Sequence, residues 1–487
     1  MSQSISFVLD GSVETIDFRA SQFTPTTTVL QLLRNHPRHK GVKEGCAEGD
    51  CGACTVVLGE IEPGGNLRYR AVDSCLVFLP MIHGKQLITV ENLKDAEGTL
   101  HAVQEAMVDT DGSQCGYCTP GFIMSLFALY RDQDTVDRPA IDDALTGNLC
   151  RCTGYRPIVE AAAKSCSSKR ADHFTDSESA TMRLLKSISR KAVYLQTSTQ
   201  SYYLPETLKE ALDYKKSNPS IMVITGGTDV ALRVTKQHEL LSSILDLSHV
   251  DELRTVHEGE ELHIGASTSL TDVLAVAKGR LPAMYSMLSV FGSRQIRNCA
   301  TLGGNLGSAS PIGDTLPVLM AYDARIVLQS SRGSREVPVR EFITGYRKTV
   351  CEEDELITRV VFPVVSDGTI VKAYKVSKRK DLDISTLNGG FCVELDGEQH
   401  VKEIVLAFGG MAAQVQRASK TEAFLQGKKW IRENIEEAML LLEKEFSPLS
   451  DVRGGATFRR VAARNLLLKF WIDMTANNSI PVETTKV

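Results

Sequence analysis

Apolar and polar residues alternate at the start of the chain and then take up a helical spacing. Residues 5–9 alternate up to an Asp-Gly pair at 10–11, and residues 13–16 resume beyond it, which predicts a β-hairpin. A helix is expected over residues 29–33, where apolar side chains follow the threonines at 26–28 that can cap it. Further strands are expected at residues 55–58, 67–72 and 87–90. The first part of the chain is therefore predicted to form a small sheet with one helix.

After this sheet the pattern becomes helical and later returns to strands. Helical runs are expected at residues 100–107, 120–131, 141–145 and 156–163. Residues 165–200 are polar with few large apolar side chains before Leu184, so we interpret their first half as a linker, with a phosphorylated or partner-binding tail as the alternative. A strand is expected at 404–408, with helices around 431–443 and 458–471. We divide the chain into residues 1–92, 93–165, a linker at 166–195, 196–368 and 369–480.

Composition indicates several globular domains. The chain has 487 residues, of which 43% are apolar and 24% are charged, and this length predicts about three or four domains that each bury a core. The formal net charge of −5 gives no electrostatic footprint for nucleic acid or an anionic membrane. The longest apolar stretch, residues 121–129, is too short to span a bilayer. No targeting segment is visible, so we expect a cytoplasmic protein.

Eight of the twelve cysteines fall into two sets of four. The first set is Cys46, Cys51, Cys54 and Cys75. Its C-x4-C-x2-C…C spacing is typical of plant-type [2Fe-2S] ligation, and Gly45, Gly49 and Gly52 permit the positive φ values that a loop around the cluster needs. The alternatives are a zinc knuckle, disulfides or buried structural thiols. Zinc sites usually pair two short knuckles, and disulfides are disfavoured without a signal peptide.

The second set is Cys115, Cys118, Cys150 and Cys152. Its spacing alone leaves zinc open as an alternative to iron. Each cysteine pair precedes an apolar run that predicts a helix, and helix N-termini favour thiolates. The other four cysteines are Cys166, Cys299, Cys351 and Cys392. We interpret these as buried core thiols, although they leave a redox-sensor role conceivable.

Two glycine segments follow in the second half of the chain. Residues 223–230 read as an apolar strand that runs into Gly226-Gly227, and residues 300–305 form a second glycine turn. Both suit backbone amides close to a pyrophosphate, because glycine has no Cβ to block the approach. Two ordinary turns are the alternative. Neither segment is a G-x-G-x-x-G fingerprint, so a Rossmann domain is not expected.

The motifs together resemble a known family. The plant-type loop, QCGYCTPG at 114–121 and LCRCTGYRP at 149–157 are similar to the iron–sulfur portion of the molybdenum hydroxylases, the xanthine dehydrogenase and aldehyde oxidase group. The resemblance implies a multidomain α+β fold: a β-grasp [2Fe-2S] ferredoxin domain, a four-helix [2Fe-2S] domain, a vanillyl-alcohol-oxidase-like FAD domain and a C-terminal α+β domain of the CO dehydrogenase flavoprotein type. It implies two [2Fe-2S] clusters held by the eight cysteines, with Gln114 beside the molybdopterin of a neighbouring subunit.

The resemblance also implies an FAD site. Its residues would be Val223, Ile224, Thr225, Gly226, Gly227, Thr228, Asp229, Val230, Phe291, Ala300, Thr301, Leu302, Gly303, Gly304, Asn305, Asp314, Ile357 and Lys375. Phe291 also has a simpler interpretation as a core residue, and Lys375 as a solvated strand end. The charged segment 375–385 is by default a solvated loop, whereas in the family the corresponding loop lies near the flavin and the nicotinamide site.

The molybdenum-binding portion of the family has no counterpart in this sequence. We therefore expect the small subunit of a split xanthine dehydrogenase, with a large molybdenum-binding partner in a dimer of heterodimers and no catalytic side chain of its own. Electrons would pass from molybdenum through both clusters to FAD and then to NAD⁺, during oxidation of hypoxanthine and xanthine to urate. Fusion of both clusters and the flavin on one chain, with SKRKDLDIS at 377–385, favours this member over a carbon monoxide, nicotinate or aldehyde enzyme. A free-standing electron carrier or sensor is a further alternative, and oxygen or a quinone could replace NAD⁺.

Overall fold

The computed structural model describes residues 3–62, 64–133, 135–167, 169–475 and 485–486. The chain divides into two compact units, which we describe separately. The first unit contains residues 1–211, 220–251 and 293–300, and the second contains residues 212–219, 252–292 and 301–487. Among the described residues, no helix is both long enough and apolar enough to cross a membrane.

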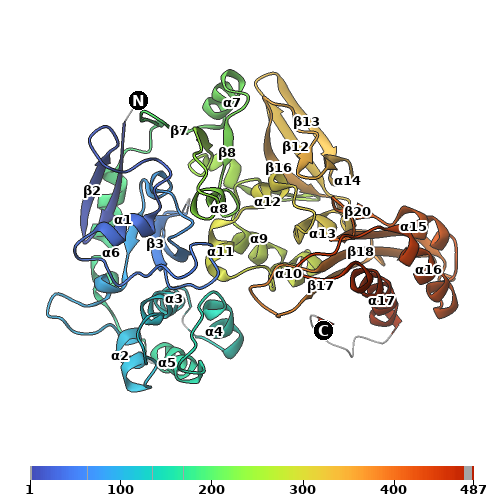
Figure 1. The fold of residues 1–487 in the computed structure, drawn as a ribbon, viewed down its shortest axis with the longest axis horizontal. Coiled ribbons are helices and arrows are strands. Elements are labelled where there is room, and N and C mark those ends of the chain that lie inside the picture. The colour runs from blue at the N-terminus through green and yellow to red at the C-terminus, as the bar shows by residue number, and fades with distance from the viewer. Residues whose placement is uncertain (1–2, 63, 134, 168, 476–484, 487) are drawn as a thin grey trace. The chain divides into compact units, whose positions relative to one another are not determined.

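The first unit begins with a five-stranded sheet in the order β2-β1-β5-β3-β4. Figure 1 draws its residues in blue, with β2, β3 and the nearby helix α1 labelled. Its strands are β1 (Ser4–Leu9), β2 (Ser12–Asp17), β3 (Thr55–Ile61), β4 (Leu67–Asp73) and β5 (Gln86–Ile88). The predicted hairpin is confirmed: β1 and β2 pair antiparallel, and Asp10 and Gly11 both have positive φ, at 50° and 71°, as a tight turn between twisted strands requires. Helix α1 (Val29–Asn35) begins where predicted, since Thr28 caps it by accepting a hydrogen bond from the Gln31 amide.

Four helices follow the sheet and bury their apolar faces together. They are α2 (Ala102–Asp109), α3 (Thr119–Asp132), α4 (Arg138–Leu145) and α5 (Arg156–Ser167), and they confirm the four predicted helical runs. Their common core includes Phe122, Leu126, Ile158 and Ala161, all of which are buried. Helix α3 also packs on β3 and β4, so the helical domain is fixed to the sheet that precedes it.

The segment 166–195 is not a simple linker, as the sequence had suggested. Residues 173–187 form helix α6 (His173–Ser187), capped by Asp172. Phe174 is buried in the core of the helical domain, 4.8 Å from the ring of Phe127, and Leu185 packs with Val8 of the sheet. The few apolar side chains of this polar segment recur at helical spacing, and they anchor it to both domains.

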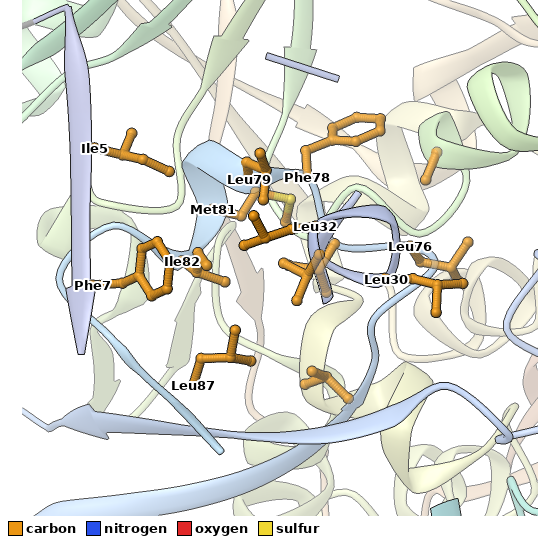
Figure 2. Packing of buried hydrophobic residues seen from close by; sticks show 14 of the residues in the cluster. Ile5, Phe7, Leu30, Leu32, Leu76, Phe78, Leu79, Met81, Ile82 and Leu87 are labelled. Atoms are coloured by element: carbon orange, nitrogen blue, oxygen red, sulfur yellow. The ribbon is translucent and has the colours of Figure 1, made fainter. Parts of the chain in front are cut away.

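The first unit ends with a small sheet in the order β6-β7-β9-β8. Its strands are β6 (Val193–Gln196), β7 (Ser201–Leu204), β8 (Met222–Ile224) and β9 (Ser243–Asp246). The same unit contains helices α8 (Val230–Thr235) and α11 (Arg294–Cys299). Tyr202, Ile224 and Ile244 of this sheet belong to the same hydrophobic core as Ile5 and Phe7 of the first sheet. Figure 2 shows part of that core, with side chains of β1 and of the chain around α1 and residues 76–87 gathered together.

The second unit contains two further five-stranded sheets, ordered β10-β11-β16-β12-β13 and β20-β19-β18-β17-β21. The first is built from β10 (Val256–Glu258), β11 (Leu262–Gly265), β12 (Arg325–Ser330), β13 (Gly333–Pro338) and β16 (Leu356–Phe362). The second is built from β17 (Ile370–Ser377), β18 (Leu387–Leu395), β19 (Val401–Gly409), β20 (Gln416–Arg417) and β21 (Thr485–Lys486). The predicted strand at 404–408 is confirmed within β19.

Helices cover these sheets. They are α9 (Leu270–Ala277), α10 (Pro282–Leu288), α12 (Leu302–Ser308), α13 (Thr315–Ala321), α14 (Val339–Phe342), α15 (Ser419–Leu425), α16 (Arg432–Glu445) and α17 (Ala456–Thr475). Helix α13 lies directly on β18 and β19. A Cβ at Gly390 would lie 2.1 Å from the Pro317 carbonyl oxygen, so a glycine is needed where this helix meets the sheet. Helices α16 and α17 confirm the predicted runs near the C-terminus.

Candidate functional site

The first cysteine set lies on the loop between α1 and β3, with Cys75 just after β4. The thiol of Cys46 contacts those of Cys51 and Cys75, and Cys75 also contacts Cys54. Gly49 and Gly52 have φ values of 79° and 65°, which confirms their predicted role in curling the loop. Gly45 serves a different purpose, because its φ is not positive and a Cβ there would lie 2.8 Å from the Cys51 Sγ.

The loop surrounds Cys46 with hydrogen-bond donors. The backbone amides of Glu48 and Asp50 donate to its Sγ at 3.4 and 3.3 Å. Together with the thiols of Cys51 and Cys75, they hold the pKa of Cys46 well below its usual range. Amides aimed at sulfur are a common means by which proteins adjust iron–sulfur clusters.

A carboxyl group lies close to this set. Asp73 is 2% exposed, and the Cys54 thiol donates to its Oδ1 at 3.8 Å. Burial raises the pKa of Asp73 well above its ordinary value, and the nearby sulfurs of Cys54 and Cys46 act in the same direction.

The second cysteine set lies at the starts of two helices, as predicted. Cys118 directly precedes α3, and Cys152 lies a few residues before α5. The thiols of Cys118 and Cys150 contact each other, as do those of Cys115 and Cys152. Burial raises the pKa of Cys118 to about 12, and the neighbouring Cys150 thiol acts in the same direction. The Thr153 hydroxyl donates to the Cys150 Sγ at 3.2 Å.

Both sets have the donor chemistry of a dinuclear cluster. All twelve cysteines are free thiols, so the disulfide alternative is not realised. In the first set Cys46 contacts Cys51 and Cys75, and Cys75 contacts Cys54, whereas the second set meets as Cys118 with Cys150 and Cys115 with Cys152. A [2Fe-2S] core is held by four thiolates, and each set brings four thiols together.

The two sets are neighbours in space. The backbone amide of Leu149, next to Cys150, donates to the carbonyl oxygen of Cys51 at 3.0 Å. A Cβ at Gly121 would lie only 2.0 Å from the Gly52 carbonyl oxygen. One main-chain hydrogen bond therefore joins a ligand of the first set to the residue beside a ligand of the second.

The first glycine segment connects β8 to α8 within the first unit. Gly227 has a φ of 70°, a backbone conformation that favours glycine at this position. Gly226 is required by packing, since a Cβ there would lie 1.8 Å from the Cys299 carbonyl oxygen and 3.1 Å from the Cα of Ala300. The structure thus packs Ala300 against Gly226, while residues 227–230 stay partly exposed.

Residues 301–305 of the second glycine segment belong to the second unit, and residues 302–305 are helical rather than a turn. Thr301 caps α12 by accepting a hydrogen bond from the Gly304 amide at 3.0 Å. The Gly303 amide donates to the Ala266 carbonyl oxygen at 2.8 Å, and a Cβ at Gly303 would lie 2.6 Å from that of Ala266. Asn305 accepts a hydrogen bond from the Thr315 hydroxyl at 2.6 Å. Here the missing Cβ serves the packing of the protein's own backbone.

Lys375 and Asp314 form a buried ion pair in the second unit. The Lys375 Nζ lies 2.8 Å from the Asp314 Oδ2 and donates to the Val290 carbonyl oxygen at 2.9 Å. The side chains are 1% and 8% exposed, so Lys375 is not the solvated strand end that the sequence allowed. Lys375 therefore bonds both to Asp314 and to Val290, the residue before Phe291. Ile357 lies elsewhere in this unit, facing Gly307 of α12.

Sequence reasoning missed two polar side chains of this cluster. Ser385 and Asn388 donate to the Asp314 Oδ1 at 2.5 and 2.6 Å. Asn388 is fully buried in an otherwise apolar strand, and a polar residue in such a strand was the available signal. Residues 375–377 lie in β17 and are buried, so only the later part of 375–385 forms the expected loop.

Family models match four consecutive stretches of the chain. Residues 13–77 match a 2Fe-2S iron–sulfur cluster binding domain, and residues 89–163 match a [2Fe-2S] binding domain. Residues 196–365 match the FAD binding domain in molybdopterin dehydrogenase, and residues 372–474 match the CO dehydrogenase flavoprotein C-terminal domain. These matches confirm the predicted fold class and the two iron–sulfur domains.

Curated relatives match over nearly the whole chain. Xanthine dehydrogenase of Emericella nidulans is 33% identical over 97% of this chain and 38% of its own length. The xanthine dehydrogenase/oxidase of Gallus gallus is 31% identical over 92% of this chain, again with 38% of its own length covered. The chain thus spans less than two fifths of the relatives that it matches.

Solved structures match a little over half of the chain. A carbon monoxide dehydrogenase chain from Hydrogenophaga pseudoflava is 25% identical with a TM-score of 0.52, covering 55% of this chain and 94% of that chain. A quinoline 2-oxidoreductase chain from Pseudomonas putida 86 is 22% identical with a TM-score of 0.53, and covers 59% of this chain. The second likeness supports the fold alone.

The chain therefore contains two [2Fe-2S] binding domains and an FAD binding domain, the composition of an iron–sulfur flavoprotein. In their order along the chain, the matched domains are similar to the iron–sulfur and flavin portion of the molybdenum hydroxylases.

Proposed function

We propose that this chain is the electron-transfer subunit of a xanthine dehydrogenase. It would receive electrons from a molybdenum site on a large partner subunit and pass them through two [2Fe-2S] clusters to FAD and NAD⁺. The observation that carries the proposal is the hydrogen bond of 3.0 Å between the Leu149 amide and the Cys51 carbonyl oxygen. It connects the ligand loops of two adjacent cluster sites, as a relay requires.

Exposure supports an order for the relay. Cys115 and Cys152 of the second set are exposed, and Tyr117, Leu149 and Tyr155 around them are 48%, 43% and 40% exposed. Large apolar side chains at a redox site favour a partner surface there. Gln114, which is also exposed, would then lie at the partner's molybdopterin. The second set would therefore be the entry point for electrons.

The first set is oriented toward the flavin segment within the first unit. Lys236, at the end of α8, donates to the Cys46 carbonyl oxygen at 3.1 Å and pairs with Glu48 at 3.2 Å. A Cβ at Gly49 would lie 2.8 Å from the Ile296 side chain of α11. The loop of the first set thus contacts the helices next to residues 223–230 and Ala300, so this set would pass electrons to FAD.

The bound groups would supply the redox chemistry, and the chain would hold them. FAD, when bound, converts between the single electrons that clusters carry and the pair that NAD⁺ accepts. Residues 223–230 and Ala300 of the first unit would contact its diphosphate. In the second unit, the further candidate FAD-binding residues are 301–305, Phe291, Asp314, Ile357 and Lys375. No side chain of this chain would act as an acid or base.

The domain arrangement favours xanthine dehydrogenase over other members. Xanthine dehydrogenases match over more than nine tenths of this chain, whereas the carbon monoxide dehydrogenase chain, 94% of which is matched, covers only 55% of it. This chain would thus share with the xanthine dehydrogenases the presence of both clusters and the flavin on one chain. A different split molybdenum hydroxylase is the second candidate, because the flavin-domain fold is common to both groups.

The test is co-expression with the large subunit and an assay of NADH production. We expect about four irons and one FAD in this chain, from two dinuclear clusters, and NADH formation with xanthine. A complex that reduces NAD⁺ with another heterocycle but not with xanthine would assign the second candidate. Zinc in place of iron, or a chain without flavin, would reject the relay itself.

A further inference from the structure

Three buried amide and hydroxyl side chains meet between the two cluster sites. Ser125 comes from α3, Asn148 from the loop before Cys150, and Gln295 from α11. The Gln295 Nε2 donates to the Ser125 Oγ and to the Asn148 Oδ1, both at 2.9 Å, and the Ser125 hydroxyl donates to the same Asn148 oxygen at 2.6 Å. All three side chains are 3% exposed or less.

This network connects directly to the ligand loops. The Asn148 Nδ2 donates to the Gly52 carbonyl oxygen at 3.0 Å and to the Thr55 hydroxyl at 3.2 Å. Gly52 lies between Cys51 and Cys54, while Asn148 lies two residues before Cys150. One amide side chain therefore links the loop of the first set to the loop of the second.

Gln295 fixes how this amide is turned. Because Gln295 and Ser125 both donate to the Asn148 oxygen, the Asn148 NH₂ group is left to face Gly52. Both amide side chains pack closely against glycines. A Cβ at Gly147 would lie 2.2 Å from the Gln295 Oε1, and a Cβ at Gly52 would lie 2.4 Å from the Asn148 Nδ2. Gln295 lies outside the segments matched by the iron–sulfur models, yet it packs between their ligand loops.

We propose that Gln295 is a positioning residue for electron transfer between the two clusters. It holds Asn148, which in turn sets the register between the Cys51 and Cys150 loops and preserves the Leu149 to Cys51 hydrogen bond. This inference rests on the proposed function, since it requires both clusters. A purely structural role for Gln295 would stabilise the chain without affecting how the clusters interact.

The test compares the full-length Gln295→Met chain with the unaltered chain. Methionine fills a similar volume but cannot donate. With both clusters reduced, we expect the variant to keep its iron content while the splitting of the EPR signals by the coupling between clusters changes. After partial reduction and rapid freezing, we expect the transfer between clusters to be about tenfold slower, the lower end of losses typical for outer-shell partners of metal ligands.

The matched control is Arg294→Gln. Arg294 also joins α11 to the helical domain, through ion pairs with Asp132 of α3 and Asp143 of α4, and these ion pairs do not involve either ligand loop. We expect its EPR splitting and transfer rate to remain those of the unaltered chain. Ser125→Ala removes the other donor to Asn148 and should change the EPR splitting in the same way as Gln295→Met. This second variant tests the positioning role if the methionine variant loses iron.

The results separate the two proposals. If the unaltered chain lacks two clusters, the proposed function fails. If it has both clusters and Gln295→Met or Ser125→Ala retains the normal splitting and rate, the positioning role is overturned. An equal change in Arg294→Gln would also overturn it, because general loosening of α11 would then explain the effect.

Discussion

Replacing Lys375 by methionine should destabilise the second unit by about 3 kcal/mol. The change removes the cation from a pair whose members are 1% and 8% exposed, and leaves the Asp314 carboxylate buried without its charge partner. Removing one member of a buried pair typically costs about 3–5 kcal/mol. Ser385 and Asn388 still donate to Asp314, so we expect the lower end of that range.

The assay is urea unfolding followed by tryptophan fluorescence. Both tryptophans, Trp430 and Trp471, lie in the second unit, so the signal reports on this unit. The control is Lys378→Met, three residues further on at an exposed position, where we expect a change within about 0.5 kcal/mol.

The double variant Lys375→Met with Asp314→Asn isolates the charge effect. The asparagine introduced in place of Asp314 would carry no charge and could still accept a hydrogen bond from Ser385. We therefore expect the double variant to recover about 2 kcal/mol of the stability lost in Lys375→Met, which is within the range of coupling energies between contacting residues. Two results would contradict the reasoning: a single variant as stable as the unaltered chain, or a double variant whose loss equals the sum of the two single losses.

Two further predictions follow from the cysteine sites and from a buried histidine pair. Cys150→Ser should lower the iron content from about four to about two per chain, because Cys150 contacts Cys118 of its own set and the first set keeps its four thiols; loss of all iron would show that the sites depend on each other. His83 and His249 stack at 5.6 Å, and burial lowers the pKa of both below the usual 6.5, so the unfolded chain binds more protons below about pH 6.5. The free energy of unfolding should therefore fall as pH drops from about 7.5 to about 5.5, by up to about 1.4 kcal/mol per pH unit for each histidine. In His249→Asn, unfolding followed by circular dichroism should record a shallower fall. A fall equal to that of the unaltered chain would contradict the role given to His249.

Local patterns predicted the fold better than they predicted the contacts between distant segments. The hairpin turn at Asp10 and Gly11 follows from neighbouring residues, so the sequence was sufficient there. Helix α6 was missed because its apolar residues, such as Phe174 and Leu185, are sparse and become informative only against a core formed by other segments. The second glycine segment was read as a turn although Thr301 supplies a helix cap.

The candidate site shows the same division. The cysteine spacing predicted two four-thiol sites, because ligands on one loop must be close in sequence. The contact between Gln295 and Asn148 joins residues 147 positions apart, and nothing in either segment indicates the other. The side chain of Lys375 was ambiguous for the same reason, since its burial depends on Asp314 and Val290 from other elements.

The shared core of the first unit explains how cluster and flavin segments can be held together precisely. Ile224 lies at the start of the first glycine segment, and it is buried in the same hydrophobic cluster as Ile5 and Leu76 of the first iron–sulfur domain. Cutting the chain between these parts would expose apolar surface on both sides, at about 25 cal/mol for each Å². The first FAD-type segment and the first iron–sulfur domain therefore share one hydrophobic core. An electron path between the first cluster loop and residues 223–230 would then run through one packed core rather than across a mobile domain boundary.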